Sequence, residues 1–574
     1  MADRILITSA LPYVNGVKHL GNLAGSILPA DVYARFQRLR GRDVLFVCGT
    51  DEHGTPAELA AAEAGLPVAA YCARQHAIQA DIYRRFAISF DHFSRSSGPR
   101  NHALTQELYR RLDANGLIEE RATRQIWSPE DGRFLPDRYV VGTCPHCGSP
   151  GARGDQCEAC SRLLDPVDLI EPRSAVSGST ALELRQSRQL YLLQSRLVDR
   201  LRAWHAGRDD WDPIVRSIAA KWLDEGLEDR CITRDLDWGV PVPRAGFEDK
   251  VFYVWFDAPI HYIAAVQEWA ALGPGRDWQD WWRPGPSCRY VQFLAKDNVP
   301  FHTIGFPATV LGSGAEIRLV DRIKGFNWLT FEGGKFSTSA RRGVFTDAAL
   351  DELPGDWWRW WLTANAPESA DVDFSFPRFA EGVNADLADN FGNLANRLLR
   401  FLGARFGGIV PSGGAPGPAE AALLARCRDL VQDITAQFEA IRLRKAAAGI
   451  RALWSLGNAY LAHQAPWAAV ATDVERAACA TRHAINVLRL AALVAAPVIP
   501  EAADRVRAAL GEPAAGTWPA PDAVTLDAIP SGRAIEPLDP LFPRLPKEWA
   551  EARAARYAPC VQDASALKAP RSGG

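Results

Sequence analysis

The sequence predicts an α/β protein in which a parallel-sheet domain is followed by an all-helical domain. Residues 4–10 form a short apolar run, residues from about 21 to 40 have helical periodicity, and residues 44–48 form a second apolar run. This order is that of a β-α-β unit, which opens a parallel sheet. From about 384 to 510, the apolar residues recur at helical spacing, which predicts a helical domain.

The parallel-sheet domain is predicted to be split by an insertion. Helical patterns continue at about 56–64, 67–86 and 99–115, and strand character returns at 251–255 and 290–294. The residues between these two groups change to short strands and turns. We therefore expect one domain in two halves, with a separate segment between them.

The insertion extends from about 117 to 240 and contains a tight cluster of four cysteines. Helical patterns near 181–206 and 213–227 close the insertion. A further block, about 326–383, contains a Gly-rich turn at 333–334 before the helical domain begins.

The composition is that of an ordinary globular protein. Of 574 residues, 47% are hydrophobic and 23% are charged, which excludes disorder, collagen and coiled coil as descriptions of the whole chain. The formal net charge is −3, which excludes a polybasic coat for non-specific nucleic-acid binding but not a local basic groove.

We expect a cytoplasmic protein that has no membrane partner. Eleven cysteines are too dilute for a disulfide scaffold. The N-terminal apolar run soon meets Pro12, Asn15 and Gly16, so it lacks the long apolar region of a signal peptide. The longest apolar stretch, residues 485–500, is too short to span a bilayer.

The cysteine cluster predicts a zinc site. Its pattern is Cys144-x2-Cys147-x9-Cys157-x2-Cys160, and paired Cys-x2-Cys segments build a tetrahedral thiolate site for zinc. Four protein ligands leave no open coordination position, so the expected role is structural. The spacing disfavours the alternative of four unrelated buried cysteines.

Two segments contain residues suited to phosphate. His19-Leu20-Gly21-Asn22 begins a helix, where free N–H groups and the helix dipole favour anions. Much further along the chain, Gly333-Gly334-Lys335-Phe336-Ser337-Thr338-Ser339 combines a glycine turn with one cation and three hydroxyls. Taken singly, these segments are also typical of a helix cap and a polar turn.

Together and in this order, the two segments resemble the signature motifs of class I aminoacyl-tRNA synthetases. Other segments resemble the methionyl-tRNA synthetase family, and the resemblance extends from about residue 4 to residue 510. These segments are Ala10-Leu11-Pro12-Tyr13, Cys48 to Pro56, Phe134 to Arg138, Val254 to Ile260, Lys296-Asp297-Asn298 and Phe301-His302.

The resemblance implies a Rossmann-type class I synthetase catalytic domain with a zinc-knuckle insertion, followed by an α-helical-bundle anticodon-binding domain. The boundaries that we predict are 1–116 and 241–325 for the two halves of the catalytic domain, 117–240 for the connective insertion, 326–383 for a stem-contact segment with the Lys335 loop, 384–550 for the anticodon-binding domain and 551–574 for a flexible tail.

The activity that the resemblance implies is ATP-dependent activation of L-methionine to methionyl-adenylate and its transfer to methionine tRNA, both initiator and elongator. Mg²⁺ would accompany ATP, and one structural Zn²⁺ would occupy the cysteine cluster. Because the chain ends soon after the helical domain, we expect a monomer. Three alternatives stay open: a paralogue with altered amino-acid or inhibitor specificity, an adenylate-forming biosynthetic ligase, and a non-catalytic tRNA-binding protein.

The resemblance also assigns residues to ATP and to catalysis. His19, Asn22 and Lys335 are the expected catalytic residues. The expected ATP-binding residues are these three together with Gly21, Asp297, Ser337 and Thr338.

The methionine and anticodon sites are assigned in the same way. Asp51 would bind the substrate ammonium by a charge-assisted hydrogen bond, and Arg234 would orient Asp51. Asn393 and Arg397 lie on one helix face and would reach base edges, while Trp467 would stack on an unstacked base. The other methionine-pocket residues are Leu11, Tyr13, Trp255, Ala258, Pro259, Tyr262 and His302.

The chain departs from the family pattern at several positions. Thr338 stands where the second signature has a lysine, and Arg341 or Arg342 would restore the missing cation. Ala295 and His261 stand at pocket positions where the family commonly has glycine.

Some relatives carry a second zinc knuckle in the insertion. The matching positions here are Ser128, Asp131, Ser174 and Ser177. Three hydroxyls and one carboxylate are poor zinc ligands, so we expect one zinc and not two.

Overall fold

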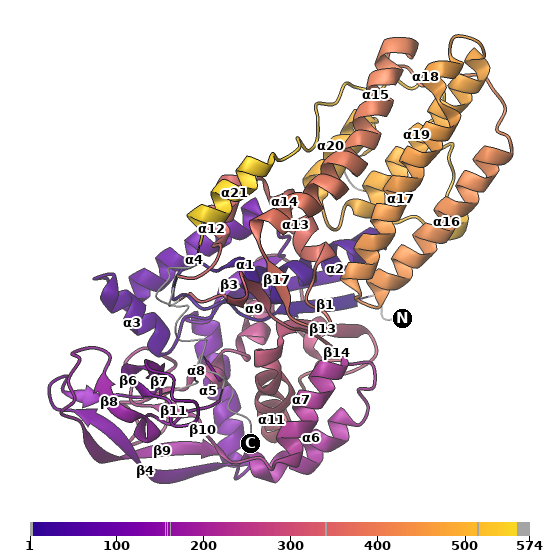
Figure 1. Ribbon diagram of the computed structural model, residues 1–574. Coiled ribbons are helices and arrows are strands. Elements are labelled where there is room, and N and C mark those ends of the chain that lie inside the picture. The colour runs from indigo at the N-terminus through magenta and orange to yellow at the C-terminus, as the bar shows by residue number, and fades with distance from the viewer. Residues whose placement is uncertain are drawn as a thin grey trace, which may run out of the picture. The chain divides into compact units, whose positions relative to one another are not determined.

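The computed structural model (Figure 1) describes residues 4–154, 157, 159–160, 162–338, 341–513 and 516–558. Ser339 of the second signature segment and residues 559–574 of the expected tail lie outside the described residues.

The chain forms two compact units. The first contains the residues up to Val17, Leu45–Asp81 and Phe90–Gly325. The second contains Lys18–Val44, Ile82–Ser89 and the chain from Phe326 onward. The segment that begins with the first signature therefore groups with the second signature.

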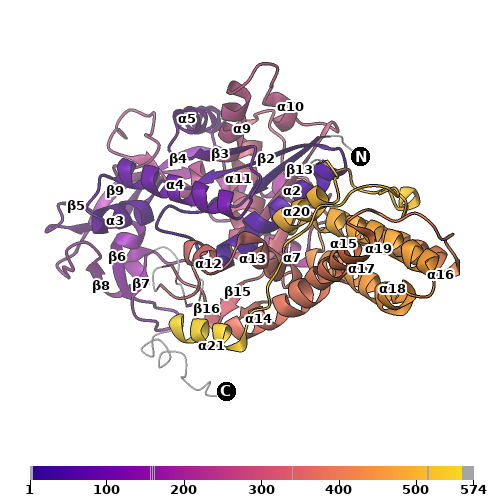
Figure 2. The same cartoon turned by 90° about the horizontal axis from the view of Figure 1, so that it is seen from above.

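A five-stranded sheet organises the first unit, in the order β14-β13-β1-β2-β3. Figure 2 labels β13, β2 and β3 of this sheet. β1 (Arg4–Ser9) pairs in parallel with β13 (Cys288–Ala295), and β2 (Asp43–Thr50) pairs in parallel with β3 (His92–Arg95). β14 (Arg322–Phe326) lies at one edge. These strands confirm the α/β fold class and the strands expected at 4–10, 44–48 and 290–294.

Apolar residues of the strands and of three helices form the core of this unit. Leu6, Val47 and Tyr290 of the sheet are almost completely buried, as are Leu108 and Val266 of the helices. Parallel strands are buried on both faces, which explains why their sequences are continuous apolar runs. The helices are α5 (Pro99–Ala114), α9 (His261–Ala271) and α11 (Phe306–Ser313).

The helix expected over 181–206 is wrong in its first half. β9 (Glu183–Leu192) pairs in antiparallel fashion with β4 (Ile118–Ser128), and only α6 (Val198–His205) is α-helical. The residues of β9 are good helix formers, but ten consecutive pairings with β4 outweigh that local preference.

The strand expected over 251–255 is also shorter than predicted. β12 contains only Val251–Phe252, and α8 (Val254–Asp257) begins directly after Tyr253. The remaining elements of this unit are α3 (Thr55–Glu63), α4 (Val68–Arg85), β5 (Arg133–Phe134), β6 (Val140–Thr143), β7 (Ala152–Arg153), β8 (Ile170–Ser174), α7 (Pro213–Asp224), β10 (Arg230–Cys231), β11 (Thr233–Arg234) and α10 (Gln279–Trp282).

A continuous helix opens the second unit. It consists of α1 (Leu20–Asn22), a π-helical turn at Leu23–Ile27 and α2 (Leu28–Leu39), and so confirms the helix expected over 21–40. A buried ion pair joins Arg359 to Asp31 of α2 at 2.7 Å.

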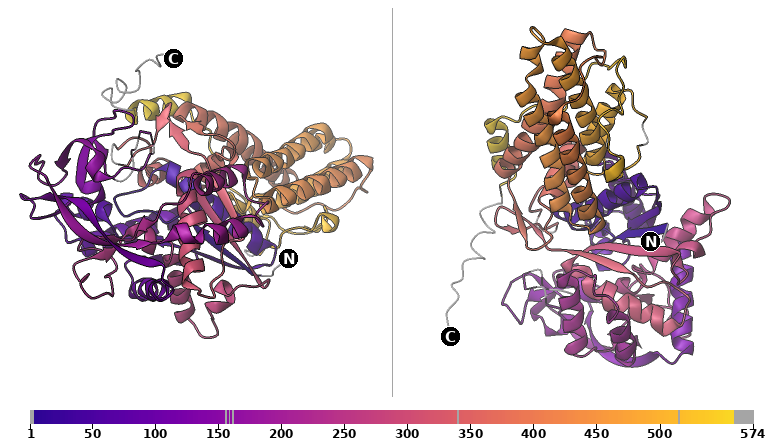
Figure 3. Two further views of the ribbon diagram at one scale, coloured as in Figure 1. Left: turned by 90° about the horizontal axis from the view of Figure 1, so that it is seen from below. Right: turned by 90° about the vertical axis from the view of Figure 1, so that its right-hand side faces the viewer.

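A helical bundle forms the end of the second unit, and its long helices run side by side in Figure 3. Trp454 lies at its core, stacked on Phe391 with 4.8 Å between ring centroids. None of the described helices is both long and apolar enough to cross a membrane. The bundle helices are α15 (Asn393–Phe406), α16 (Pro418–Glu439), α17 (Leu443–Gln464), α18 (Pro466–Ala469), α19 (Val474–Ala495) and α20 (Pro500–Ala509).

The strands and helices between Leu329 and Val383, which precede the bundle, are short. β15 (Leu329–Phe331) pairs with β16 (Gly334–Lys335) and with β17 (Val372–Phe374). The helices are α12 (Thr346–Glu352), α13 (Gly355–Ala364) and α14 (Phe376–Val383), and α21 (Lys547–Arg556) follows the bundle.

Candidate functional site

His19 and Asn22 close the start of α1 by reciprocal hydrogen bonds. The N–H of Asn22 donates to Nδ1 of His19 at 3.3 Å, and the N–H of His19 donates to Oδ1 of Asn22 at 3.2 Å. Burial and the neighbouring Lys18 lower the pKa of His19 to about 3, so its ring is neutral near pH 7. Because Nδ1 accepts, the ring proton lies on Nε2, which is then a donor for a phosphate oxygen.

The structure brings the two signature segments into contact. The ring of His19 stacks on the ring of Phe336, with 4.9 Å between centroids and 24° between planes. Gly343 makes room for this ring, because a Cβ at Gly343 would lie 2.0 Å from it, and its φ of +120° also favours glycine. Phe336 therefore holds the second segment beside His19.

Lys335 lies on the hairpin that β15 and β16 form. Its Nζ lies 4.2 Å from the centroid of the Trp328 ring, a cation–π contact that orients the exposed ammonium. Ser337 and Arg342 exchange two backbone hydrogen bonds of 3.0 and 2.9 Å, which close the loop that contains Thr338.

The two arginines proposed to replace the missing lysine differ in their surroundings. Arg342 donates to the carbonyl oxygens of Phe331 at 3.0 Å and of Glu332 at 3.3 Å, so it stabilises the loop from within. Arg341 is exposed and has a φ of 50°, at the turn of the same loop. Arg341 is therefore the better placed of the two to meet a solvent-borne phosphate.

In the first unit, backbone hydrogen bonds hold Tyr13 beside Asp51. The N–H of Val14 donates to the carbonyl of Asp51 at 3.1 Å, and the N–H of Asp51 donates to that of Pro12 at 2.9 Å. The indole N–H of Trp255 donates to the Tyr13 hydroxyl at 3.1 Å. Asp51 is buried, with 4% of its surface exposed. Three of the expected methionine-pocket residues therefore lie together.

Tyr262 and His302 form a second buried pair of the expected pocket. Nδ1 of His302 lies 2.9 Å from the carbonyl of Asn298, and Nε2 lies 3.0 Å from the Tyr262 hydroxyl. Burial lowers the pKa of His302 to about 4, so the neutral ring donates from Nδ1 and accepts at Nε2. The remaining expected residues include Leu11 and Ala258, which pack in one apolar cluster, and the buried Pro259.

Asp297 and His261 lie near the carboxyl ends of the parallel strands. Asp297 is exposed in the turn that follows β13, the sheet edge at which nucleotides bind in such folds. His261 is completely buried against Gly49, where a Cβ would lie 2.4 Å from the His261 Nε2 atom. The imidazole at position 261 therefore requires glycine at position 49.

Arg234 has a different partner from the one expected. Its Nε donates to the two carboxylate oxygens of Asp137 at 3.1 and 2.9 Å, and its guanidinium lies 3.8 Å from the Tyr253 ring centroid. The geometry thus does not show the expected orientation of Asp51 by Arg234. Arg234, in β11 near the end of the insertion, instead binds Asp137 in an earlier part of the insertion.

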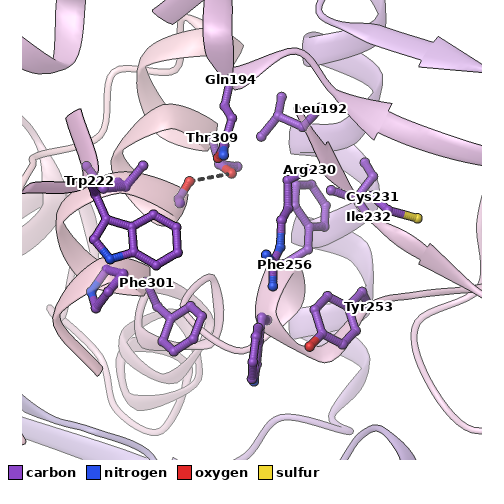
Figure 4. Close-up of a pocket in the computed structure, with 14 residues that line it drawn as sticks. Leu192, Gln194, Trp222, Arg230, Cys231, Ile232, Tyr253, Phe256, Phe301 and Thr309 are labelled. Carbon is purple, nitrogen blue, oxygen red and sulfur yellow. Dashed lines mark hydrogen bonds between the residues drawn. The ribbon is translucent and has the colours of Figure 1, made fainter. Parts of the chain in front are cut away.

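An apolar cavity of about 50 Å³ lies beside the pocket residue Trp255. Figure 4 shows Trp222 and Phe301 on one side of it and Tyr253 and Phe256 on the other. The rings of Trp255 and Phe301 are 4.3 Å apart, so the indole that contacts Tyr13 also borders this cavity.

The four cysteines come together as a metal site requires. All four sulfur atoms lie within 4.8 Å of one another, and the Cys147–Cys157 and Cys144–Cys160 pairs are 3.7 and 4.0 Å apart. A tetrahedral zinc with Zn–S bonds of about 2.3 Å separates its sulfurs by about 3.8 Å. The cluster therefore fits zinc.

The two turns at the positions of a second knuckle have the same backbone hydrogen bond as the turn at Cys144 of the cysteine cluster. The N–H of Gly132 donates to the carbonyl of Ser128 at 2.9 Å, and Gly178 does the same to Ser174 at 3.1 Å, as Gly148 does to Cys144. The hydroxyl of Ser177 donates to Asp131 at 3.1 Å and so joins the two turns. Hydrogen bonds therefore connect turns that lack thiolates.

In the second unit, two of the expected anticodon residues lie in contact. The Arg397 guanidinium lies 4.6 Å from the Trp467 ring centroid, and Trp467 is 38% exposed. Asn393 donates to Asn458 at 3.0 Å and borders a groove of about 320 Å³. An exposed aromatic ring beside a guanidinium is suited to single-stranded RNA.

Sequence reasoning missed two buried side chains beside the expected pocket residues. Glu52 is fully buried and binds Nε of Arg95 at 2.9 Å, and His53 binds Asp257 at 2.8 Å. The available signal was their position: Glu52 and His53 directly follow Asp51, and Asp257 directly precedes Ala258.

The comparisons with known proteins define the class. A family profile described as tRNA synthetases class I (M) matches residues 5–399. A second, described as the anticodon binding domain of methionyl tRNA ligase, matches residues 410–562. The fold and the two signature segments are accordingly those of a class I tRNA synthetase.

Individual relatives define the family. The methionine–tRNA ligase of Caulobacter sp. (strain K31) is 57% identical over 554 residues, covering 95% of this chain and 97% of that protein. That of Caulobacter vibrioides (strain NA1000 / CB15N) is 55% identical over 563 residues, covering 96% and 99%. A solved structure of Mycobacterium tuberculosis methionyl-tRNA synthetase in complex with methionyl-adenylate has a TM-score of 0.75 at 28% identity, covering 94% of this chain and 100% of that chain. The chain belongs to the methionine–tRNA ligase family, which confirms the resemblance seen in the sequence.

Proposed function

We propose that this ligase joins L-methionine to ATP, giving methionyl-adenylate and pyrophosphate, and then transfers methionine to methionine tRNA. The observation that carries the proposal is the stack of His19 on Phe336, because it brings the two phosphate-binding signature segments together. The apolar, aromatic surroundings of Trp255 and Tyr262 suit a thioether.

We assign the phosphate chemistry to His19, Asn22 and Lys335. The neutral His19 donates from Nε2 to phosphate oxygens, and Asn22 adds a second uncharged donor. Lys335 supplies the cation that stabilises the charge of the pentacoordinate α-phosphate as the methionine carboxylate attacks. Gly21, Ser337 and Thr338 of the second unit and Asp297 of the first unit are also assigned to the nucleotide. Mg²⁺ that accompanies ATP would neutralise part of the phosphate charge.

We further propose that the chain works as a monomer in the cytoplasm. All residues assigned to methionine, ATP and the anticodon come from one chain, so no second subunit has to complete a site. The thiols of the cysteine cluster require a reducing compartment to bind metal.

Methionine-dependent ATP–pyrophosphate exchange tests the proposed reaction. We expect exchange with methionine and much less with homocysteine or norleucine, followed by charging of methionine tRNA. Exchange with a different amino acid would instead support a paralogue of altered specificity. The buried His261 would then be the first residue to test as the cause. Folded, zinc-loaded protein without any exchange would contradict the proposal.

The cysteine cluster predicts one zinc per chain. Metal analysis of purified protein is expected to give one equivalent, and Cys144→Ser is expected to bind almost none, with a lower melting temperature, because the metal contributes to folding. Ser128→Ala, at a turn without thiolates, is the control and should keep the zinc. Two equivalents in the wild type would contradict the single-site proposal.

Trp467 predicts a separation of tRNA charging from amino-acid activation. Trp467→Ala should lower kcat/KM for methionine tRNA about tenfold, since stacking on one base contributes about 1–3 kcal/mol. ATP–pyrophosphate exchange should not change. Val474→Ala, which truncates an exposed apolar side chain of the same bundle, is the control. Equal charging by Trp467→Ala and wild type would remove Trp467 from the anticodon site.

A further inference from the structure

A buried hydrogen-bonded group lies behind the expected methionine pocket. Nδ1 of His53 lies 2.8 Å from Oδ2 of Asp257, and both side chains are 1% exposed or less. Asn101 donates to the same carboxylate oxygen at 3.3 Å and to the carbonyl of Ser96 at 2.8 Å. Nε2 of His102 lies 3.3 Å from Nε2 of His53. We call the first pair the His53–Asp257 clasp.

The proton positions in this group follow from its partners. The Asp257 carboxylate accepts from Nδ1–H of His53, which leaves Nε2 of His53 as an acceptor. His102 then donates from its own Nε2. Burial lowers the pKa of His102 to about 4, so this ring is neutral and one of its nitrogens carries a proton. The hydrogen bonds of this group therefore run in one direction, from His102 to His53 and from His53 to Asp257.

The clasp joins two separate segments of the pocket. His53 lies two residues after Asp51, the residue assigned to the substrate ammonium. Asp257 ends α8, which carries Trp255, and directly precedes Ala258. The two segments are distant in sequence, and the hydrogen bond of His53 with Asp257 links them directly.

A buried carboxylate–imidazole hydrogen bond of this kind is a costly way to gain stability alone, because the carboxylate loses its hydration. Apolar residues of similar volume often stabilise a core as well or better. The pair has good geometry and joins the segment that contains Asp51 to the segment that contains Trp255 and Ala258. Methionine binding would depend on the separation of these segments, because one is assigned to its ammonium and the other to its apolar side chain.

We propose that His53 and Asp257 are positioning residues that set the affinity for methionine by holding the Asp51 segment and the Trp255–Ala258 segment at a fixed separation. This inference rests on the proposed methionine pocket. Neither side chain contacts the substrate in this proposal, so both act through their neighbours.

The test uses the full-length enzyme with His53→Ala, Asp257→Ala, the double variant and His53→Asn. Asn can keep an N–H donor near the position of the imidazole Nδ1. We expect each alanine variant to raise KM for methionine at least tenfold and KM for ATP less than twofold in ATP–pyrophosphate exchange. The double variant should have a KM for methionine no higher than that of the more impaired single variant, because the two residues act as one unit. His53→Asn should stay within threefold of wild type.

Glu420→Gln is the matched control. It weakens the contact of another buried carboxylate, the ion pair of Glu420 with the partly exposed Arg476 in the helical bundle, and should leave KM for methionine unchanged. The melting temperature of each variant separates unfolding from a weaker pocket. A KM for methionine within twofold of wild type in the alanine variants, or equal rises for methionine and ATP, would overturn the clasp. Wild type without methionine-dependent exchange would instead overturn the proposed function.

Discussion

Replacing Lys335 by alanine is expected to lower kcat for ATP–pyrophosphate exchange by about 10²–10³-fold, the usual effect of removing one preorganised group that stabilises transition-state charge. The reason is specific to this chain. The second signature has Thr338 where the family has a second lysine, so Lys335 is the single lysine of the segment. KM for methionine should change little, because Lys335 is assigned to phosphate.

Two comparisons make this expectation sharper. Arg341→Ala should lower kcat below that of the wild type if the exposed Arg341 supplies the second cation. Arg342→Ala should instead lower kcat by loosening the loop, because Arg342 donates hydrogen bonds to Phe331 and Glu332. Lys221→Ala, on an exposed helix of the insertion, controls for loss of a lysine elsewhere. A Lys335→Ala enzyme with more than a tenth of the wild-type kcat would show that its charge is not needed.

The parts of the fold that the sequence predicted well are those in which local pattern and tertiary burial agree. The apolar runs of β1, β2 and β13 are buried on both faces and could be nothing but central strands or core helices. The bundle helices carry their apolar residues at helical spacing. The prediction for β9 failed because its residues favour a helix, whereas the strand depends on pairing with β4, about sixty residues earlier.

The site residues also fall into a group that the sequence could predict and a group that it could not. Residues within recognisable segments, such as His19, Lys335 and the four cysteines, could be assigned from spacing and resemblance. Contacts between segments could not. The stack of His19 on Phe336, the pairing of Arg234 with Asp137 and the His53–Asp257 clasp each join residues far apart in the chain. Nothing in a single sequence states which distant side chains will meet.

Replacing Asp51 by asparagine is expected to raise KM for methionine about 10²-fold with little change in KM for ATP. A hydrogen bond to a charged group contributes about 1.5–3 kcal/mol, and the buried position of Asp51 keeps its charge from being screened by water. Asparagine has nearly the same shape, so the pocket and its backbone pairing with Tyr13 should persist.

The ammonium itself provides the decisive readout for Asp51. The desamino analogue 4-(methylthio)butanoate lacks only this group, so the wild type should bind it about 10²-fold more weakly than methionine in competition with ATP–pyrophosphate exchange. Asp51→Asn should bind both about equally, because the interaction that distinguishes them is gone. The exposed Asp249→Asn should keep the wild-type preference. If Asp51→Asn also keeps it, the ammonium is bound by another group, and the pocket would have to be assigned again from that group outward.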